Sequence, residues 1–453
     1  MTNKTTLAGR VGIVGTGHRA RLYNSAVTAR GSHVVALCDT NPARRAVHNR
    51  MLEEAGCARA KEYDAADFER MLDEMALDVL VVTTVDATHD LYIVPALHRG
   101  IRVLTEKPMT TDVPKCRRIL DAVSETGGSM QGESLLGVLT PVLFNYRYNP
   151  VHWKVEELVS SGAIGNVKSV HFEWLLDTVH GADYFRRWHR YKERSGGLMV
   201  HKSSHHFDLV NFWINAKPKS VFGMGRLAFY GSQAGAKSGW ARSYNRARGA
   251  PEAATDPFAI DLEAEPSLKS LYADAEGCDG YHRDMNVFAP DITIEDDMGL
   301  LVRYDSGATM TYHLTAYSPW EGYRVMINGD QGRLELEVVE SSHRDPITRE
   351  GVTHGDKELP NAGGVSLSIQ KLWGRREEVP VVMGEGGHGG GDEAMLDQLF
   401  GPRPGAEVVS TPVERLSANE VDGALAMAVG LAANESFRTG KLVEIDELLG
   451  VVL

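Results

Sequence analysis

The chain has 453 residues, which is enough for about two or three domains and too long for a single core. Its composition, with 43% hydrophobic and 24% charged residues, is that of a folded globular protein and excludes a disordered chain. The net charge of −13 disfavours nucleic acid and anionic membranes as partners, whereas an uncharged polyhydroxylated substrate is indifferent to it.

Cysteine spacing and hydropathy exclude further classes. Cys38, Cys57, Cys116 and Cys278 lie far apart without a C-x-x-C pair, so neither a disulfide framework nor a zinc site is indicated. The first ten residues contain no apolar stretch typical of a signal peptide, and no apolar run reaches the roughly 18–20 residues that span a bilayer. We therefore expect a soluble, cytoplasmic protein.

Strand-like and helix-like segments alternate in the first third of the chain. Short apolar runs predict buried strands at 11–14, 33–38, 78–83 and 101–105, and helical stretches separate them. Strands that alternate with helices form βαβ units, and continuous apolar runs are typical of parallel strands covered on both faces. Residues 1–148 are therefore assigned to a doubly wound parallel α/β domain.

The pattern changes after Pro150. Strands, several of them with period-two alternation, are predicted at 168–175, 299–304, 308–314 and 323–328, with turn sequences between them. This pattern indicates an antiparallel sheet with one solvated face. Residues 149–453 are assigned to a second domain.

Two long segments fit neither pattern. We expect residues 231–291 and 353–391 to be insertions in the second domain, of the kind that form lids or binding segments. The acidic run at 295–297 is interpreted as a solvated strand edge rather than a site. A helix rich in small residues is predicted near 418–438, ended by Gly440.

A glycine-rich turn follows the first predicted strand and opens the first helix. Residues 15–20 read GTGHRA, in which Gly15 allows a tight turn, Gly17 lets the backbone approach a pyrophosphate, and the helix N-terminus offers N–H groups to phosphates. We therefore expect Gly15, Thr16, Gly17, His18 and Arg19 to bind a dinucleotide in a Rossmann domain. A generic tight turn is the alternative, because such motifs also occur by chance.

Asp39 lies about 20 residues beyond Gly17, at the end of the second strand, where an acid binds the ribose 2′-hydroxyl. Its carboxylate would repel the 2′-phosphate of NADP, so the sequence favours NAD. Arg44 and Arg45 stand close enough along the chain to soften that preference.

Several further blocks occur in a specific order: VGIVGTGHRA (11–20), DVLVVTTVDATH (78–89), GIRVLTEKP (100–108), NYRYNP (145–150), SSGAIGNV (160–167), SGGLMVHKSSHHFDL (195–209) and NGDQGRLEL (328–336). With them the chain resembles the glucose–fructose oxidoreductase / inositol dehydrogenase / rhizopine catabolism (Gfo/Idh/MocA) family over nearly its whole length. The resemblance implies a Rossmann domain, then an α/β domain with an open, mostly antiparallel sheet, and NAD(P)-dependent oxidation of a carbohydrate. It also implies a homodimer or homotetramer assembled through the C-terminal sheet.

The family's Glu-Lys-Pro motif falls on Glu106, Lys107 and Pro108. The resemblance implies that Lys107 lies beside the nicotinamide and the reacting carbinol, where it can hydrogen-bond the developing alkoxide. It further implies that Glu106 neighbours the cofactor and that Pro108 follows a cis peptide bond. Without the surrounding blocks, a surface lysine before a turn proline would be the simpler interpretation.

The family's G-G-x-x-x-D-x-x-x-H-x-x-D stretch aligns on Gly196 and places its histidine at His205. Its first aspartate is replaced here by His201, so two imidazoles are expected one helical turn apart on one face. We predict His205 as the base, with His201 orienting the sugar or polarising the same hydroxyl, and Lys202 as a further substrate contact. Two alternatives are that these histidines are structural or capping residues, or that His201, His205 and His388 bind a metal, although the family's chemistry needs no metal.

The resemblance also places Thr84 and His89 along the nicotinamide ribose and Arg147 near the cofactor or substrate. Aromatic faces alternating with polar groups suit a pyranose ring, and this pattern gives the remaining predicted substrate contacts: Trp174, Asp177, Tyr184, Arg186 and Trp188. Core packing is an equal alternative for Trp174.

Three functions remain open. The leading one is a sugar or polyol oxidoreductase, in which Lys107 and His205 remove a hydroxyl proton while a hydride passes to the nicotinamide. The second is glycoside cleavage by transient NAD-dependent oxidation, elimination and re-reduction, for which a second histidine is a candidate base. The third is a sugar-sensing regulator that binds NAD without turnover, which has no need of both Lys107 and His205.

Overall fold

The computed structural model describes residues 9–127, 141–344, 363–382, 384, 387–405, 416–451 and 453. The chain divides into two compact units. The first unit comprises Met1–Phe144, Leu262–Arg283 and Glu393–Ala424, and the second comprises Asn145–Asp261, Asp284–Asp392 and Leu425–Leu453. Two segments that the sequence placed in the second domain, 262–283 and 393–424, therefore lie in the first unit.

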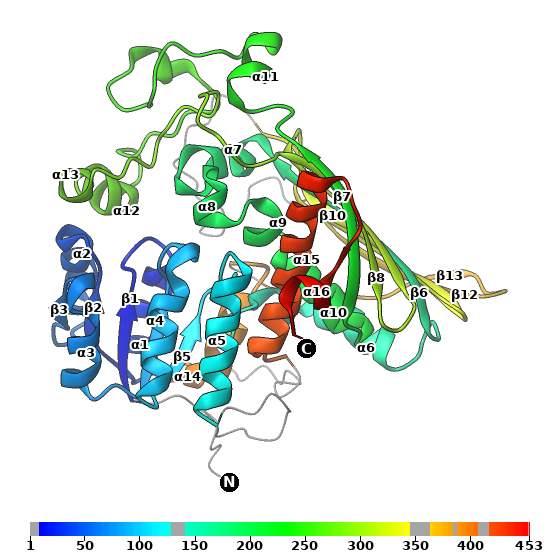
Figure 1. Ribbon diagram of the computed structural model, residues 1–453, viewed down its shortest axis with the longest axis horizontal. Coiled ribbons are helices and arrows are strands. Elements are labelled where there is room, and N and C mark those ends of the chain that lie inside the picture. Colours follow the sequence, from blue (N-terminus) through cyan, green and yellow to red (C-terminus); the bar gives the residue numbers. More distant parts are fainter. Residues whose placement is uncertain are drawn as a thin grey trace. The chain divides into compact units, whose positions relative to one another are not determined.

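The first unit is built on a five-stranded sheet whose paired strands are all parallel, in the order β3-β2-β1-β4-β5. Its strands are β1 (Arg10–Val14), β2 (His33–Cys38), β3 (Lys61–Tyr63), β4 (Val79–Val82) and β5 (Arg102–Thr105). Five helices connect and follow them: α1 (Ala20–Ala29), α2 (Pro42–Glu54), α3 (Phe68–Met75), α4 (His89–His98) and α5 (Val113–Glu125), drawn in blue and cyan in Figure 1. This is the strand order of a Rossmann fold, with a switch point between β1 and β4 where ligands bind.

Local chemistry accounts for most of these elements. β4 is buried at every residue and β1 at all but its first, which is why both read as continuous apolar runs. α2 begins at Pro42 because the Asn41 side chain accepts hydrogen bonds from the Ala43 and Arg44 N–H groups. The sequence did not predict β3, since its residues KEY are polar and it lies at the sheet edge.

The second unit is built on a nine-stranded sheet in the order β13-β12-β11-β10-β6-β9-β8-β7-β14. All neighbouring strands are antiparallel except β6 and β9, which are parallel. The strands are β6 (Val167–Asp177), β7 (Pro218–Arg226), β8 (Asp297–Tyr304), β9 (Thr309–Ser318), β10 (Glu321–Gly329), β11 (Gly332–Ser341), β12 (Gly364–Lys371), β13 (Arg376–Glu378) and β14 (Val443–Glu444). The fold class predicted from the sequence, a parallel Rossmann sheet and a mostly antiparallel sheet, is confirmed.

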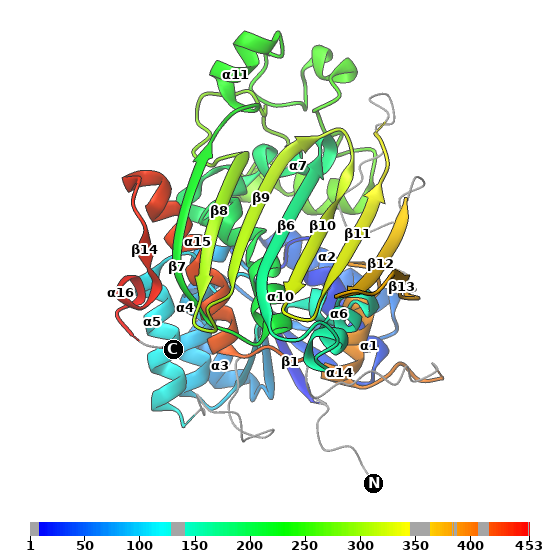
Figure 2. The same cartoon turned by 90° about the vertical axis from the view of Figure 1, so that its right-hand side faces the viewer.

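One face of this sheet is covered by helices and the other is open (Figure 2). Burial alternates along the central strands, so that Phe172 and Trp174 of β6 face the helices while His171 and Glu173 face outward.

The remaining helices of the two units are α6 (Pro150–Ser160), α7 (Thr178–Arg186), α8 (Lys192–Ser195), α9 (Leu198–His201), α10 (Ser204–Ile214), α11 (Gly231–Ser238), α12 (Pro266–Leu268), α13 (Glu276–Asp279), α14 (Gly391–Phe400), α15 (Glu420–Thr439) and α16 (Ile445–Leu449). In the described ranges, no helix combines the length and apolar character needed to cross a membrane.

Two expectations need correction. Residues 353–391 were expected to be an insertion of the lid or binding-segment kind, but the described part of this segment forms β12 and β13, which extend the second sheet at its edge. The acidic run at 295–297 is not a solvated edge throughout, because Asp296 is fully buried and accepts hydrogen bonds from the Ala228, Phe229 and Tyr230 N–H groups at 2.6 to 2.8 Å. Burial raises the pKa of Asp296 to about 6 in spite of these bonds.

Candidate functional site

The glycine turn of the first unit follows β1 at the switch point of the sheet. Gly15 has φ +84°, and a Cβ on it would lie within 2.7 Å of backbone atoms of Thr83 and Thr84, so only glycine fits this position. The Thr83 hydroxyl donates to the Gly15 carbonyl at 2.6 Å and thereby ties the turn to the end of β4. Among the described residues, the nearest atom to a Cβ on Gly17 would be the Tyr272 hydroxyl oxygen at 3.7 Å, so that part of the structure leaves the backbone there open to a ligand.

Asp39 lies at the end of β2, beside the turn. One carboxylate oxygen accepts the Thr16 N–H at 2.6 Å and the other accepts the Asn41 N–H at 2.8 Å, which leaves further lone pairs on both oxygens for a ribose hydroxyl. Arg45 donates to the Asp39 carbonyl. Arg44 pairs with Asp279 at 2.8 Å and donates to the Leu271 carbonyl at 3.0 Å. Both arginines that the sequence offered to a 2′-phosphate thus have bonds to protein groups.

Glu106 connects the turn to the predicted catalytic lysine. Its carboxylate accepts hydrogen bonds from the Arg19 guanidinium at 2.5 Å, the Tyr23 hydroxyl at 2.6 Å and the Lys107 backbone N–H at 3.2 Å. Burial raises the pKa of Glu106, but the nearby Arg19 charge and the Tyr23 hydrogen bond outweigh it and the net shift is downward. Glu106 is therefore an anion that fixes the backbone at Lys107, and Lys107 itself is half-buried. The peptide bond between Lys107 and Pro108 is cis, as expected.

The His89 ring lies between the Glu-Lys-Pro loop and the backbone of Thr84. The His89 ring is fully buried, with Nδ1 3.0 Å from the Pro108 carbonyl oxygen and Nε2 3.3 Å from the Thr84 carbonyl oxygen. Burial lowers the pKa of His89, so the ring is neutral at pH 7. These contacts favour a role for His89 in positioning the Glu-Lys-Pro loop; its predicted contact with the cofactor stays a prediction, as does that of Thr84.

The two predicted histidines of the second unit lie on two short helices instead of one. α9 ends at His201, α10 begins at Ser204, and Lys202 and Ser203 lie in the break between them. The His201 ring centroid lies 4.1 Å from that of His189 and 5.5 Å from that of Tyr184. The helix that was expected to carry both histidines is thus interrupted between them.

His205 has different neighbours. Its ring centroid lies 4.8 Å from that of Tyr146 and 6.0 Å from that of His388. The His388 Nδ1 lies 2.9 Å from Asn145 Nδ2 and 2.9 Å from an Asp392 oxygen. Among the described residues there is no group of three histidine, cysteine or acidic side chains arranged to hold a metal ion.

Lys202 is buried against aromatic rings. Its Nζ lies 4.8 Å from the ring centroid of Trp174 and 5.5 Å from that of Tyr146, which are cation–π distances. Burial lowers the pKa of Lys202, while Glu340 and Glu321 oppose that shift. Trp174 is fully buried and stacks on Tyr323 at 4.4 Å, so in this unit it serves as core.

A buried acid–imidazole pair lies near this lysine. His180 Nδ1 is 2.6 Å from a Glu321 oxygen, and His180 Nε2 is 3.0 Å from the hydroxyl of Tyr184. Burial raises the pKa of Glu321 well above its usual range and lowers the pKa of His180 well below its own. Burial and the Glu321 charge also raise the pKa of Glu340, to about 7. Sequence patterns did not indicate this pair, because its members are 141 positions apart.

The other predicted contacts of the second unit make local bonds. Arg147 donates to both oxygens of Asp208, at 2.8 and 2.6 Å, in a buried bidentate pair. Asp177 caps α7 by accepting the Val179 and His180 N–H groups, and it pairs with Arg344. Arg186 donates to the carbonyls of Val179 and Phe258, and Trp188 stacks on His189 at 3.5 Å. Their roles toward a substrate stay predictions.

These features define a class. The first unit has the features of a dinucleotide-binding unit: a Rossmann sheet, a glycine turn at its switch point that is open at Gly17, and an acid at the end of β2. The same chain continues into an α/β unit with an open, mostly antiparallel sheet.

Comparison with known proteins places the chain within this class. Residues 9–132 match the model of an oxidoreductase family with an NAD-binding Rossmann fold, and residues 156–445 match that family's C-terminal alpha/beta domain. YteT of Bacillus subtilis, which carries an oxidoreductase name, is 34% identical over 92% of both chains. The inositol 2-dehydrogenase of Salmonella paratyphi B is 28% identical over 38% of this chain and 45% of its own. The WlbA dehydrogenase of Bordetella pertussis, solved with NADH and UDP-GlcNAcA, has the same fold, with a TM-score of 0.59 over 96% of this chain and 98% of its own at 17% identity.

The chain belongs to the Gfo/Idh/MocA oxidoreductase family, and it is an NAD-binding oxidoreductase.

Proposed function

We propose that the protein transfers a hydride between a carbinol carbon of a sugar, polyol or glycoside and a bound nicotinamide. The nicotinamide, when bound, supplies the redox chemistry, so the chain's own residues have to bind the substrate and move its hydroxyl proton. The observation that carries the proposal is the Glu106 carboxylate, which holds the Arg19 side chain of the glycine turn and the Lys107 N–H together. This contact ties the predicted catalytic lysine to the dinucleotide site within one unit.

In this proposal Lys107 donates a hydrogen bond to the substrate oxygen and stabilises the alkoxide as its carbon loses hydride. His205 takes the hydroxyl proton, and His201 and Lys202 contact other hydroxyls of the carbohydrate. An inositol 2-dehydrogenase among the similar proteins supports a polyhydroxylated substrate.

The test is a panel of sugars, polyols and glycosides incubated with excess NAD⁺, in which NADH absorbance and released aglycone are followed together. Formation of NADH that depends on one class of compound supports hydride transfer and identifies the substrate class. Binding of NAD without turnover of any compound would instead point to a sugar-sensing regulator.

A second candidate function is glycoside cleavage by transient oxidation, elimination and re-reduction. The observation in its favour is the second imidazole, His201, whose ring centroid lies 4.1 Å from that of His189. A base in that position would suit removal of the proton next to the new carbonyl. Release of aglycone without net NADH in the same panel would establish this reaction.

We propose NAD as the cofactor in preference to NADP, and we predict that Asp39 sets that preference. Replacing Asp39 by asparagine removes the charge that repels a 2′-phosphate but keeps the size of the side chain. The ratio of NAD to NADP affinity is expected to fall by about tenfold or more, because one charged contact contributes roughly 1.5–3 kcal/mol. Titration of both reduced dinucleotides by fluorescence measures the ratio, and an unchanged ratio would contradict the assignment of Asp39.

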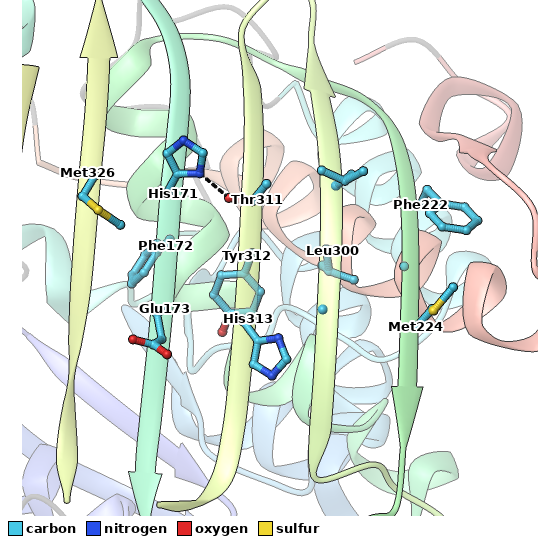
Figure 3. A pocket seen from close by; sticks show the side chains of 13 residues that line it. His171, Phe172, Glu173, Phe222, Met224, Leu300, Thr311, Tyr312, His313 and Met326 are labelled. Carbon is cyan, nitrogen blue, oxygen red and sulfur yellow. Dashed lines mark hydrogen bonds between the residues drawn. The ribbon is translucent and has the colours of Figure 1, made fainter.

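We also propose that two or four copies associate through the outer face of the second sheet. A pocket opens on this face, and Figure 3 shows the side chains that line it, Glu173 and His313 among them. Met224 and Leu301 are 71% and 54% exposed there. A face that carries acids, histidines and exposed apolar groups is complementary to a second copy of itself.

Light scattering after gel filtration is expected to give two or four times the chain mass. The Leu301→Arg variant should shift the protein toward the monomer, because it buries a charge in the proposed interface. A monomeric wild-type protein would contradict the proposal, and so would an unchanged assembly of the variant.

A further inference from the structure

Residues 262–283 belong to the first unit, although the chain on either side of them belongs to the second. They form α12, a π-helical turn at Lys269–Ala273 and α13. Leu268, Leu271 and Ala275 are buried, so the segment is packed firmly on its unit. π-helical turns are rare and are frequent at functional sites.

Tyr272, in the π-helical turn, lies at the glycine turn. Its hydroxyl accepts a hydrogen bond from the His18 backbone N–H at 3.1 Å, across 254 positions of sequence. The His18 amide is one of the groups that such a turn presents to phosphate, and the same hydroxyl borders the space left open at Gly17. Within the described part of the chain, the proton of this hydroxyl meets no acceptor, so it is available to a phosphate oxygen.

The segment is anchored beside Asp39 as well. Asn41 Nδ2 donates to the Ala275 carbonyl at 3.0 Å, and the Asn41 N–H is the group bound to Asp39. The Arg44 guanidinium lies 5.5 Å from the ring centroids of both Tyr272 and Tyr281, in addition to its bonds to Leu271 and Asp279. The segment therefore contacts both the phosphate end and the ribose end of the predicted dinucleotide site.

We propose that residues 262–283 are a cofactor clamp, in which the Tyr272 hydroxyl donates a hydrogen bond to the pyrophosphate and holds NAD on the protein between turnovers. The proposal rests on NAD-dependent function. Release of the dinucleotide then requires loss of the Tyr272 bond, and the Arg44 contacts keep the clamp in place. A slowly exchanging cofactor follows from this arrangement.

The experiment measures the rate at which bound NADH leaves. The full-length protein is loaded with NADH and chased with excess NAD⁺, and the fluorescence of bound NADH is followed. We expect the Tyr272→Phe variant to release NADH about tenfold faster or more, because it loses a hydrogen bond to a charged group. The Asp279→Asn variant, which weakens the Arg44 anchor, should also release NADH faster.

The matched control is Lys269→Ala, which removes an exposed ion pair with Asp274 from the same π-helical turn and should leave the rate unchanged. Thermal unfolding of each variant separates a loss of the clamp from a loss of the fold. Equal release rates in wild type and the Tyr272→Phe variant would overturn the clamp, and so would slower release, which would make the hydroxyl a competitor of phosphate. A wild-type protein that binds no NADH would overturn the proposed function as well.

Discussion

The Lys107→Met variant is expected to lower kcat by about 10³-fold, with NADH affinity changed by less than about threefold. Methionine keeps most of the length of the lysine side chain but cannot donate a hydrogen bond to the substrate oxygen, and loss of one such donor to a developing oxyanion costs roughly 10²- to 10³-fold. The Glu106 bonds to Arg19, Tyr23 and the backbone N–H of residue 107 do not involve the lysine side chain, so the loop and the dinucleotide site remain in place.

Single-turnover formation of NADH with the best substrate of the panel measures this effect, and NADH fluorescence measures the affinity. Lys115→Met is a matched control in the same unit, because Lys115 pairs with Asp112 at the start of α5. Its kcat should equal that of the wild type. A Lys107→Met variant with more than about a tenth of wild-type kcat would contradict the proposed role of Lys107.

The features of this protein that could be predicted well are those whose structure depends on residues close by in the sequence. β2 was predicted at the residues that form it, and the glycine turn, Asp39 and the cis bond before Pro108 were all expected from local patterns. In each case the signal is a short apolar run, a residue that the backbone requires, or a motif of a family. Such signals need no knowledge of the tertiary contacts.

The features that escaped prediction depend on distant partners. Nothing near Tyr272 indicates that its hydroxyl binds the His18 amide, because the two residues are 254 positions apart. The edge strands β12 and β13 carry too few buried residues to show a clear periodicity, with β13 exposed at all three positions. Asp296 belongs to an acidic run of the kind found on surfaces. Three backbone N–H groups of a distant loop donate hydrogen bonds to it, and these partners cannot be read from the neighbouring sequence.

The break between α9 and α10 shows the same limit within a motif. His201 and His205 were expected on one helical face from their spacing alone, but spacing defines a face only where the helix is continuous. The Ser203 N–H donates to the Leu198 carbonyl, five residues back, so the turn at Lys202 and Ser203 departs from the regular helical pattern. His189 and Tyr184 lie beside the His201 ring, whereas Tyr146 and His388 lie beside the His205 ring, and the roles of the two imidazoles have to be separated by experiment.

The last prediction makes that separation. The His205→Asn variant is expected to lower kcat by about 10²- to 10⁴-fold, because asparagine cannot accept the hydroxyl proton. The His201→Asn variant should mainly raise KM, since we propose that His201 contacts another hydroxyl of the carbohydrate. Steady-state kinetics measures both, and thermal unfolding shows whether each variant is folded. If the His201→Asn variant loses kcat while the His205→Asn variant retains it, the base has been assigned to the wrong imidazole, and His201, beside Tyr184 and His189, takes the proton.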